Sequence, residues 1–176
     1  LQAQLPNIQG MSISGVPYVH SDAGGFARSE ADAELYVRWL QFAAFTPIFR
    51  PHGTALGKIS TPDNDIPSEP SEWPEPTKSL AKKAALERYR WLPYNYTLSY
   101  RQTNYGQPLV TPLFFLNEYD SNLYKAGNQY LWGERVMVAP VIEKGIKKMN
   151  YYIPSGKWTN LYDFRTIEGG RWYTDS

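Results

Sequence analysis

Residues 15–26 read GVPYVHSDAGGF and residues 45–53 read FTPIFRPHG; these two stretches, with the segment that joins them, decide the fold. Residues 12–20 are short, apolar and β-prone, which is typical of a buried parallel strand. Residues 21–26 continue the chain as a glycine-rich turn. We predict a second short strand over residues 46–50, ending in the sequence Pro-His-Gly.

A helix is predicted to join the two strands. Ser29 is a good N-cap, and Asp32 stands three positions later, as in a capping box. Glu34 and Arg38 have the spacing and the order of a favourable ion pair on one helix face. Residues 35–45 are apolar on nearly all sides, which indicates a helix buried on more than one face. Strand, helix and strand together form a βαβ unit, which implies a parallel sheet.

Helices are also predicted on either side of this unit. Residues 1–10 have the spacing of a helix end, with Gly10 as its stop. A long helix over residues 77–104 should kink at Pro93 and end at Gly106. The basic side chains on its early surface are interpreted as a solvated face, and they are Lys78, Lys82, Lys83, Arg88 and Arg90.

The remaining segments set the domain organisation. The proline-rich loop over residues 54–76 is long enough to be either functional or disordered. After residue 107, short aromatic and β-branched runs alternate with turns, which indicates antiparallel strands at the start of a β-sandwich. We therefore expect two domains, residues 1–106 and residues 107–176. The runs assigned to strands cover residues 108–116, 129–142, 149–153 and 157–164.

Composition excludes several classes of protein. The 18 basic and 17 acidic side chains give a net charge of +1, so electrostatics offers no case for nucleic acid or an anionic membrane. The sequence has no cysteine and 2 histidines, which excludes disulfides, thiolate nucleophiles and multi-histidine metal sites. It also lacks a membrane-spanning apolar run, a phosphate-binding loop and a dinucleotide fingerprint. We expect no metal and no cofactor, and no nucleic-acid or membrane partner.

The candidate site residues stand at the carboxyl ends of the two predicted strands, where parallel α/β folds place their chemistry. Asp22 follows the first strand and Arg50 and His52 follow the second, which predicts an Arg–carboxylate pair in the wall of a polar pocket. Each of these residues has a structural alternative. Asp22 could be a turn residue that accepts backbone N–H groups, its pair with Arg50 could be a structural ion pair, and His52 could cap a loop. Phe26 is the candidate for an apolar ligand wall, and Trp39 is assigned to the core.

The same stretches resemble known motifs. Residues 15–26, followed by ELYVRWLQF and FTPIFRPHG, resemble a hallmark of glycoside hydrolase family 31, which holds α-glucosidases, α-xylosidases and related transglucosylases. Further matches, in order, are LERYRWLPYNYTL at 86–98, PLVTPLFF at 108–115, QYLWG at 129–133, VAPV at 138–141 and YIPSGKW at 152–158.

The resemblance implies an α/β part followed by a β part: the last strand–helix units of a (β/α)8 TIM barrel, then an antiparallel β-sandwich segment. It implies a retaining mechanism in which two carboxyl groups about 5–5.5 Å apart act as nucleophile and acid/base. Both catalytic motifs of the family lie upstream of residue 1, so we expect a piece of a longer enzyme that is inactive alone. Its partners would be an oligosaccharide substrate and the remaining segments of its own barrel.

The resemblance also implies roles for single residues. His52 takes the position that hydrogen-bonds the ring hydroxyls of the bound sugar, Asp22 and Arg50 form the polar pocket floor, and Phe26 forms an apolar wall. Two alternatives stay open: an α-transglucosylase, which passes the same intermediate to a sugar hydroxyl, and a non-catalytic carbohydrate-binding or interaction domain. The sugar, the compartment and the oligomeric state stay open as well.

Overall fold

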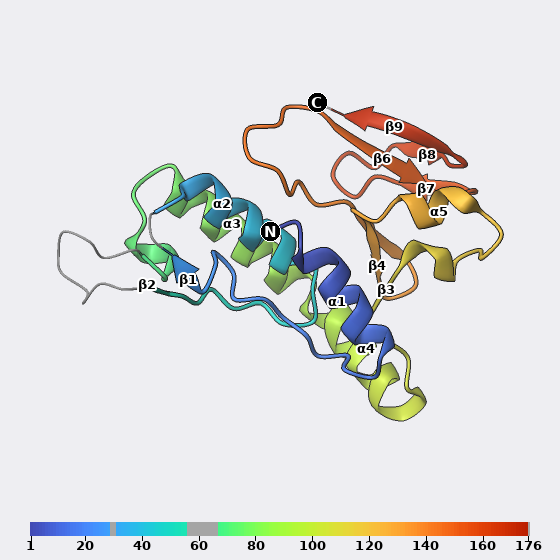
Figure 1. Cartoon of the computed structure of the whole chain (residues 1–176), viewed down its shortest axis with the longest axis horizontal. Helices are drawn as coiled ribbons and strands as arrows, with labels where there is room; N and C mark the ends of the chain where they lie inside the picture. Colours follow the sequence, from blue (N-terminus) through green and yellow to red (C-terminus); the bar gives the residue numbers. More distant parts are fainter. Residues whose placement is uncertain (29–30, 56–66, 176) are drawn as a thin grey trace.

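The computed structural model describes residues 1–28, 31–55 and 67–175. Its first part is mainly helical, with α2 and α3 side by side, and its last part is mainly antiparallel strands (Figure 1). The helices are α1 (Gln4–Ile13), α2 (Ala33–Ala43), α3 (Thr77–Arg90), α4 (Leu92–Tyr105) and α5 (Ser121–Lys125), with the short 3₁₀ turns η1 (Pro70–Glu72) and η2 (Leu113–Phe115).

The strands of the described part form four small sheets. A parallel pair joins β1 (Ala27–Arg28) to β2 (Thr54–Ala55). The prediction of antiparallel strands after residue 107 is confirmed, because every strand pair beyond that point is antiparallel. One sheet has the order β3–β4–β5, and the two others pair β6 with β9 and β7 with β8. These strands are β3 (Val110–Thr111), β4 (Tyr130–Trp132), β5 (Val136–Val138), β6 (Met149–Ile153), β7 (Lys157–Thr159), β8 (Thr166–Glu168) and β9 (Arg171–Asp175).

The predicted strand over residues 12–20 is wrong. Helix α1 continues through Gly10 to Ile13, and the residue after its C-cap is Gly15, whose φ of +90° places it in the left-handed region. The N–H of Val16 donates to the carbonyl of Met11 at 3.0 Å, which is the bond that closes a helix C-terminus of this kind. A glycine five residues beyond the expected stop therefore sets the helix end, and the parallel pairing begins only farther along the chain.

The predicted strand over residues 46–50 is also wrong, because side chains take the carbonyls that a strand would pair. Arg88 of α3 is buried, and its Nη1 donates to the carbonyls of Ala44 at 3.3 Å and Thr46 at 2.5 Å. Its Nη2 donates to the carbonyl of Pro47 at 2.7 Å. The interpretation of Arg88 as part of a solvated face is therefore wrong: the guanidinium is an internal donor for a turn.

Two further side chains hold the same turn. The Tyr130 hydroxyl donates to the carbonyl of Phe45 at 2.8 Å, and the Asn95 amide donates to the carbonyl of Pro47 at 3.2 Å. The Arg88 guanidinium lies 5.8 Å from the Trp132 ring centroid, within the range of a cation–π contact. Side chains from α3, α4 and β4 thus converge on the turn after α2.

The N-terminus of α2 lies later than predicted. Asp32 is the N-cap and accepts the N–H of Leu35 at 3.0 Å, while Ser29 lies outside the described residues. The predicted Glu34–Arg38 ion pair is confirmed, with an N···O distance of 2.7 Å. The assignment of Trp39 to the core is confirmed as well, because its side chain is buried and belongs to the main hydrophobic core.

The predicted long helix with an interruption near Pro93 is confirmed. Helices α3 and α4 meet at Trp91, and Gly106 closes α4 in the left-handed conformation. One hydrophobic core runs from the helices into the first antiparallel sheet, so that Phe42 of α2 meets Tyr130 edge to face. The core therefore binds the helical part to the β-rich part.

Arg88 allows a test of the turn after α2. Arg88→Ala leaves the buried carbonyls of Ala44 and Thr46 without their donor, while the carbonyl of Pro47 keeps Asn95. Each unsatisfied group costs about 1–3 kcal/mol, so we expect a loss of at least about 2 kcal/mol and a clearly lower Tm in the intact protein. Arg88→Lys should restore only part of the lost stability, because an ammonium cannot reproduce the planar arrangement of the guanidinium N–H donors.

Arg90→Ala is the matched control for this measurement. Arg90 lies on the same helix with a side chain 73% exposed, and within the described part of the chain its ion pair is with Glu87, one turn earlier. Its removal should change stability by no more than about 0.5 kcal/mol. Equal melting temperatures for the two alanine variants would contradict the internal role of Arg88.

Candidate functional site

The chain brings the two predicted site segments together by a short parallel contact. The N–H of Ala23 donates to the carbonyl of Arg50 at 3.0 Å, and the N–H of His52 donates to the carbonyl of Ala23 at 3.3 Å. Ala23 and Pro51 form the bridge between the two segments. Asp22 is therefore the immediate neighbour of the segment that carries Arg50 and His52.

The side chains form two contacts across this bridge. Asp22 Oδ1 lies 3.9 Å from Arg50 Nη1, and the rings of Phe26 and His52 have centroids 5.4 Å apart. The Arg50 side chain is 54% exposed, so solvent weakens its attraction to the carboxylate. The structure thus places Asp22 beside Arg50 and Phe26 beside His52.

His20 is a neighbour of the site that the sequence analysis did not select. Its Nε2 lies 3.4 Å from Asp22 Oδ1, and its side chain is 19% exposed. Among the described residues its buried Nδ1 has no hydrogen-bond partner. The spacing from Asp22 could have identified His20, because side chains two positions apart in an extended segment point to the same side.

Side chains of helix α2 contact the segment on both sides of Asp22 in the sequence. Trp39 Nε1 donates to Ser21 Oγ at 2.8 Å. Gly24 has a φ of +92°, and a Cβ at that position would lie 2.5 Å from Cδ2 of Tyr36. Only glycine fits there, so the ring of Tyr36 packs directly against the backbone of the turn.

The same tyrosine ties a third segment to the site. Its hydroxyl donates to the carbonyl of Ser68 at 2.8 Å, and its ring centroid lies 4.7 Å from that of Trp73. Ser68 Oγ in turn donates to the carbonyl of Gly53, next to His52, at 3.3 Å. Tyr36 therefore connects both sides of the parallel bridge through packed and hydrogen-bonded groups.

The side chains of the candidate site are partly exposed: that of Arg50 is 54% exposed and Phe26 is 49% exposed. A hollow of about 260 Å³ lies elsewhere, between α4 and the first antiparallel sheet, and another lies around residues 114–124. A carboxylate, a guanidinium and imidazoles beside a phenyl ring can exchange hydrogen bonds with hydroxyl groups and cover an apolar ring face. Among the described residues no cluster of acidic and histidine side chains could hold a metal ion, and no helix is long and apolar enough to cross a membrane.

Comparison with known families accounts for nearly the whole chain. Residues 1–98 match the "Glycosyl hydrolases family 31 TIM-barrel domain", and residues 106–176 match the "Glycosyl hydrolase family 31 C-terminal domain". The chain belongs to glycosyl hydrolase family 31. The predicted order of a TIM-barrel tail and a following C-terminal domain is therefore confirmed in outline.

Known relatives match over nearly the full chain. "Alpha-glucosidase 2" of Bacillus thermoamyloliquefaciens is 35% identical over 98% of this chain and 21% of that protein. "Alpha-xylosidase" of Saccharolobus solfataricus is 34% identical over 97% of this chain and 23% of that protein. The crystal structure of a family 31 alpha-xylosidase from a soil metagenome, complexed with xylose, superposes with a TM-score of 0.87 at 27% identity, over 98% of this chain and 28% of that one. The chain thus spans about a fifth to a quarter of the length of the curated relatives it matches.

Two glycine variants isolate the contact between α2 and the site. Gly15 and Gly24 have φ values of +90° and +92°, so alanine is strained at both. A Cβ at Gly15 meets open space, whereas one at Gly24 collides with Tyr36. Gly24→Ala should therefore lower the Tm of the intact protein clearly more than Gly15→Ala. Equal losses in thermal melts would show that the ring of Tyr36 moves aside without cost.

Proposed function

We propose that this chain is the sugar-holding C-terminal piece of a retaining α-glycosidase that cleaves α-glucosidic or α-xylosidic bonds in oligosaccharides. One observation carries the proposal: in a family 31 chain, Asp22, Arg50, His52 and Phe26 converge at one parallel bridge. Relatives named alpha-glucosidase and alpha-xylosidase support this reaction class.

In this proposal each site residue has its own task. His52 hydrogen-bonds ring hydroxyls of the bound sugar, and Asp22 accepts further hydroxyl donors while Arg50, 3.9 Å away, orients its carboxylate. Phe26, packed on His52, covers an apolar face of the sugar. Such contacts accelerate the reaction to the extent that they strengthen as the sugar becomes oxocarbenium-like.

The bond-breaking carboxylates belong to the preceding part of the barrel in this proposal. A retaining glycosidase needs two carboxyl groups about 5–5.5 Å apart, one on each side of the scissile bond. The described site offers Asp22 between the guanidinium of Arg50 and the imidazole of His20, both of which can hold a carboxylate in place as a binding group. The partners of this chain are thus an oligosaccharide and the rest of its own barrel.

The proposal keeps the two-domain division of the chain. Residues 1–106 would be the end of the barrel, and residues 107–176 the start of a β-sandwich. The closure of α4 at the left-handed Gly106 supports a boundary at this point, and so do the ranges of the two family matches.

His52→Ala in the intact protein tests the sugar-binding role. Loss of a hydrogen bond that strengthens in the transition state should lower kcat/KM roughly 10²–10³-fold. The Tm should change little, because the backbone N–H of His52, which pairs with Ala23, remains in the variant. The measurement is turnover of p-nitrophenyl α-glucoside and p-nitrophenyl α-xyloside, beside a thermal melt.

His52→Gln is the matched control, since its amide can still donate to a hydroxyl. We expect it to keep more of the activity than His52→Ala does. A lower Tm with near-normal kcat/KM in His52→Ala would show instead that the histidine caps a loop, and it would also weaken the binding role of Arg50.

A further inference from the structure

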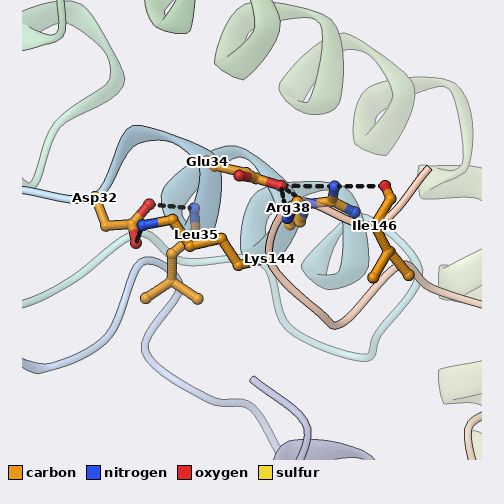
Figure 2. Close-up of polar contacts among 7 residues, drawn as sticks. Asp32, Glu34, Leu35, Arg38, Lys144 and Ile146 are labelled. Carbon is orange, nitrogen blue, oxygen red and sulfur yellow. Dashed lines mark hydrogen bonds and ion pairs between the residues drawn. The ribbon is translucent and has the colours of Figure 1, made fainter.

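A loop of the β-rich part binds the N-terminal end of α2. Between β5 and β6, Lys144 Nζ lies 2.8 Å from Asp32 Oδ2, and the N–H of Gly145 donates to Glu34 Oε1 at 2.7 Å. Figure 2 shows these groups with the Arg38 side chain directed toward the carbonyl of Ile146, at 3.5 Å. We call this set of contacts the α2–loop clamp; its members are Asp32, Glu34, Arg38, Lys144, Gly145 and Ile146.

Charge strengthens the clamp. The N–H of Gly145, followed by Arg38, lowers the pKa of Glu34, and the N–H of Leu35, followed by Lys144, lowers the pKa of Asp32. Carboxyl groups with a lowered pKa in the folded state stabilise it above their ordinary pKa values and lose this effect as the pH falls through the lowered ones. At neutral pH both carboxylates are therefore ionised and hold the loop.

The opposite face of the same helix holds the candidate sugar site. Trp39 donates to Ser21, and Tyr36 packs against Gly24, on either side of Asp22 in the sequence. Helix α2 thus has the segment of Asp22 on its buried face and the loop at residues 144–146 on its exposed face. A packed helix moves as one body, so a contact released on one face can shift what the other face holds.

We propose that Glu34 is a positioning residue for the sugar site: through it the loop at residues 144–146 fixes α2, and α2 fixes residues 21–26 with Asp22 and Phe26. The inference rests on the proposed function of those residues. It makes the C-terminal part of the chain a determinant of sugar binding, although it contributes no side chain to the candidate site. Hydroxyl recognition depends on this placement, because hydrogen bonds weaken steeply when their geometry is disturbed.

The test compares Glu34→Ala with Glu134→Ala in the intact protein. Glu134 also joins the β-rich part to a helix, through an ion pair of 3.1 Å with Arg101 of α4, so it is matched in kind and differs in the helix it holds. Two quantities are measured: KM and kcat for p-nitrophenyl α-glucoside and p-nitrophenyl α-xyloside, and amide hydrogen exchange at Ala23 and His52, whose N–H groups form the parallel bridge.

Glu34→Ala should raise KM about fivefold or more with kcat nearly unchanged, and should speed exchange at Ala23 and His52. Glu34→Gln keeps an acceptor for the N–H of Gly145 and should restore most of both quantities. Glu134→Ala should leave both near their original values. If Glu34→Ala does not fold, Lys144→Ala is used with the same expected outcomes.

Unchanged exchange at Ala23 and His52 in Glu34→Ala overturns the proposal, whatever the activity. Faster exchange with unchanged KM overturns it as well. Asp22→Asn then separates the causes: if that variant also keeps its KM, the sugar site itself has been misassigned, and if its KM rises, only the coupling through α2 is absent.

Discussion

The buried guanidinium of Arg88 is the interaction on which the rest of the structure depends. It supplies the donors that the carbonyls of Ala44, Thr46 and Pro47 need at the point where the chain leaves α2. From this turn the backbone runs directly to Arg50 and His52. Burial lowers the pKa of Arg88, yet arginine keeps its charge in proteins, so this set of bonds is present at every pH that the fold survives.

Aromatic side chains extend this arrangement from the helices into the sheet. Trp132 lies edge to face with Phe45, Trp91 and Tyr94, and the Tyr94 hydroxyl donates to the backbone carbonyl of Trp132. Such contacts add about 0.5–1.5 kcal/mol per pair beyond the burial of their area. The two segments matched by separate family models therefore share one hydrophobic core. The segment with Arg50 and His52 begins next to this core.

The sequence allowed the helices and the meeting of the site residues to be predicted, because both follow from local or topological rules. Capping and ion-pair signals placed α2, and the kink at Pro93 and the stop at Gly106 fitted α3 and α4. The rule for parallel strand ends brought Asp22 to Arg50. The strand over residues 12–20 failed for a local reason, because Gly15 rather than Gly10 ends α1. The strand over residues 46–50 failed for a non-local one: Arg88, more than 40 positions away from these carbonyls in the chain, takes bonds that a strand would form. The clamp joins residues separated by 108 or more positions, which no periodicity reveals.

The hydrogen bond from the Tyr130 hydroxyl to the Phe45 carbonyl has a consequence for folding during synthesis. Its two residues are 85 positions apart, so at ordinary rates of synthesis roughly 4–17 s pass between their exits from the ribosome. During that interval the ring of Phe45 lacks Trp132 and its carbonyl lacks the tyrosine donor. Helices α3 and α4 are synthesised within the interval, so even after α4 is complete this contact is still missing. The helical part thus has an incomplete surface when it emerges, and the first antiparallel sheet completes it.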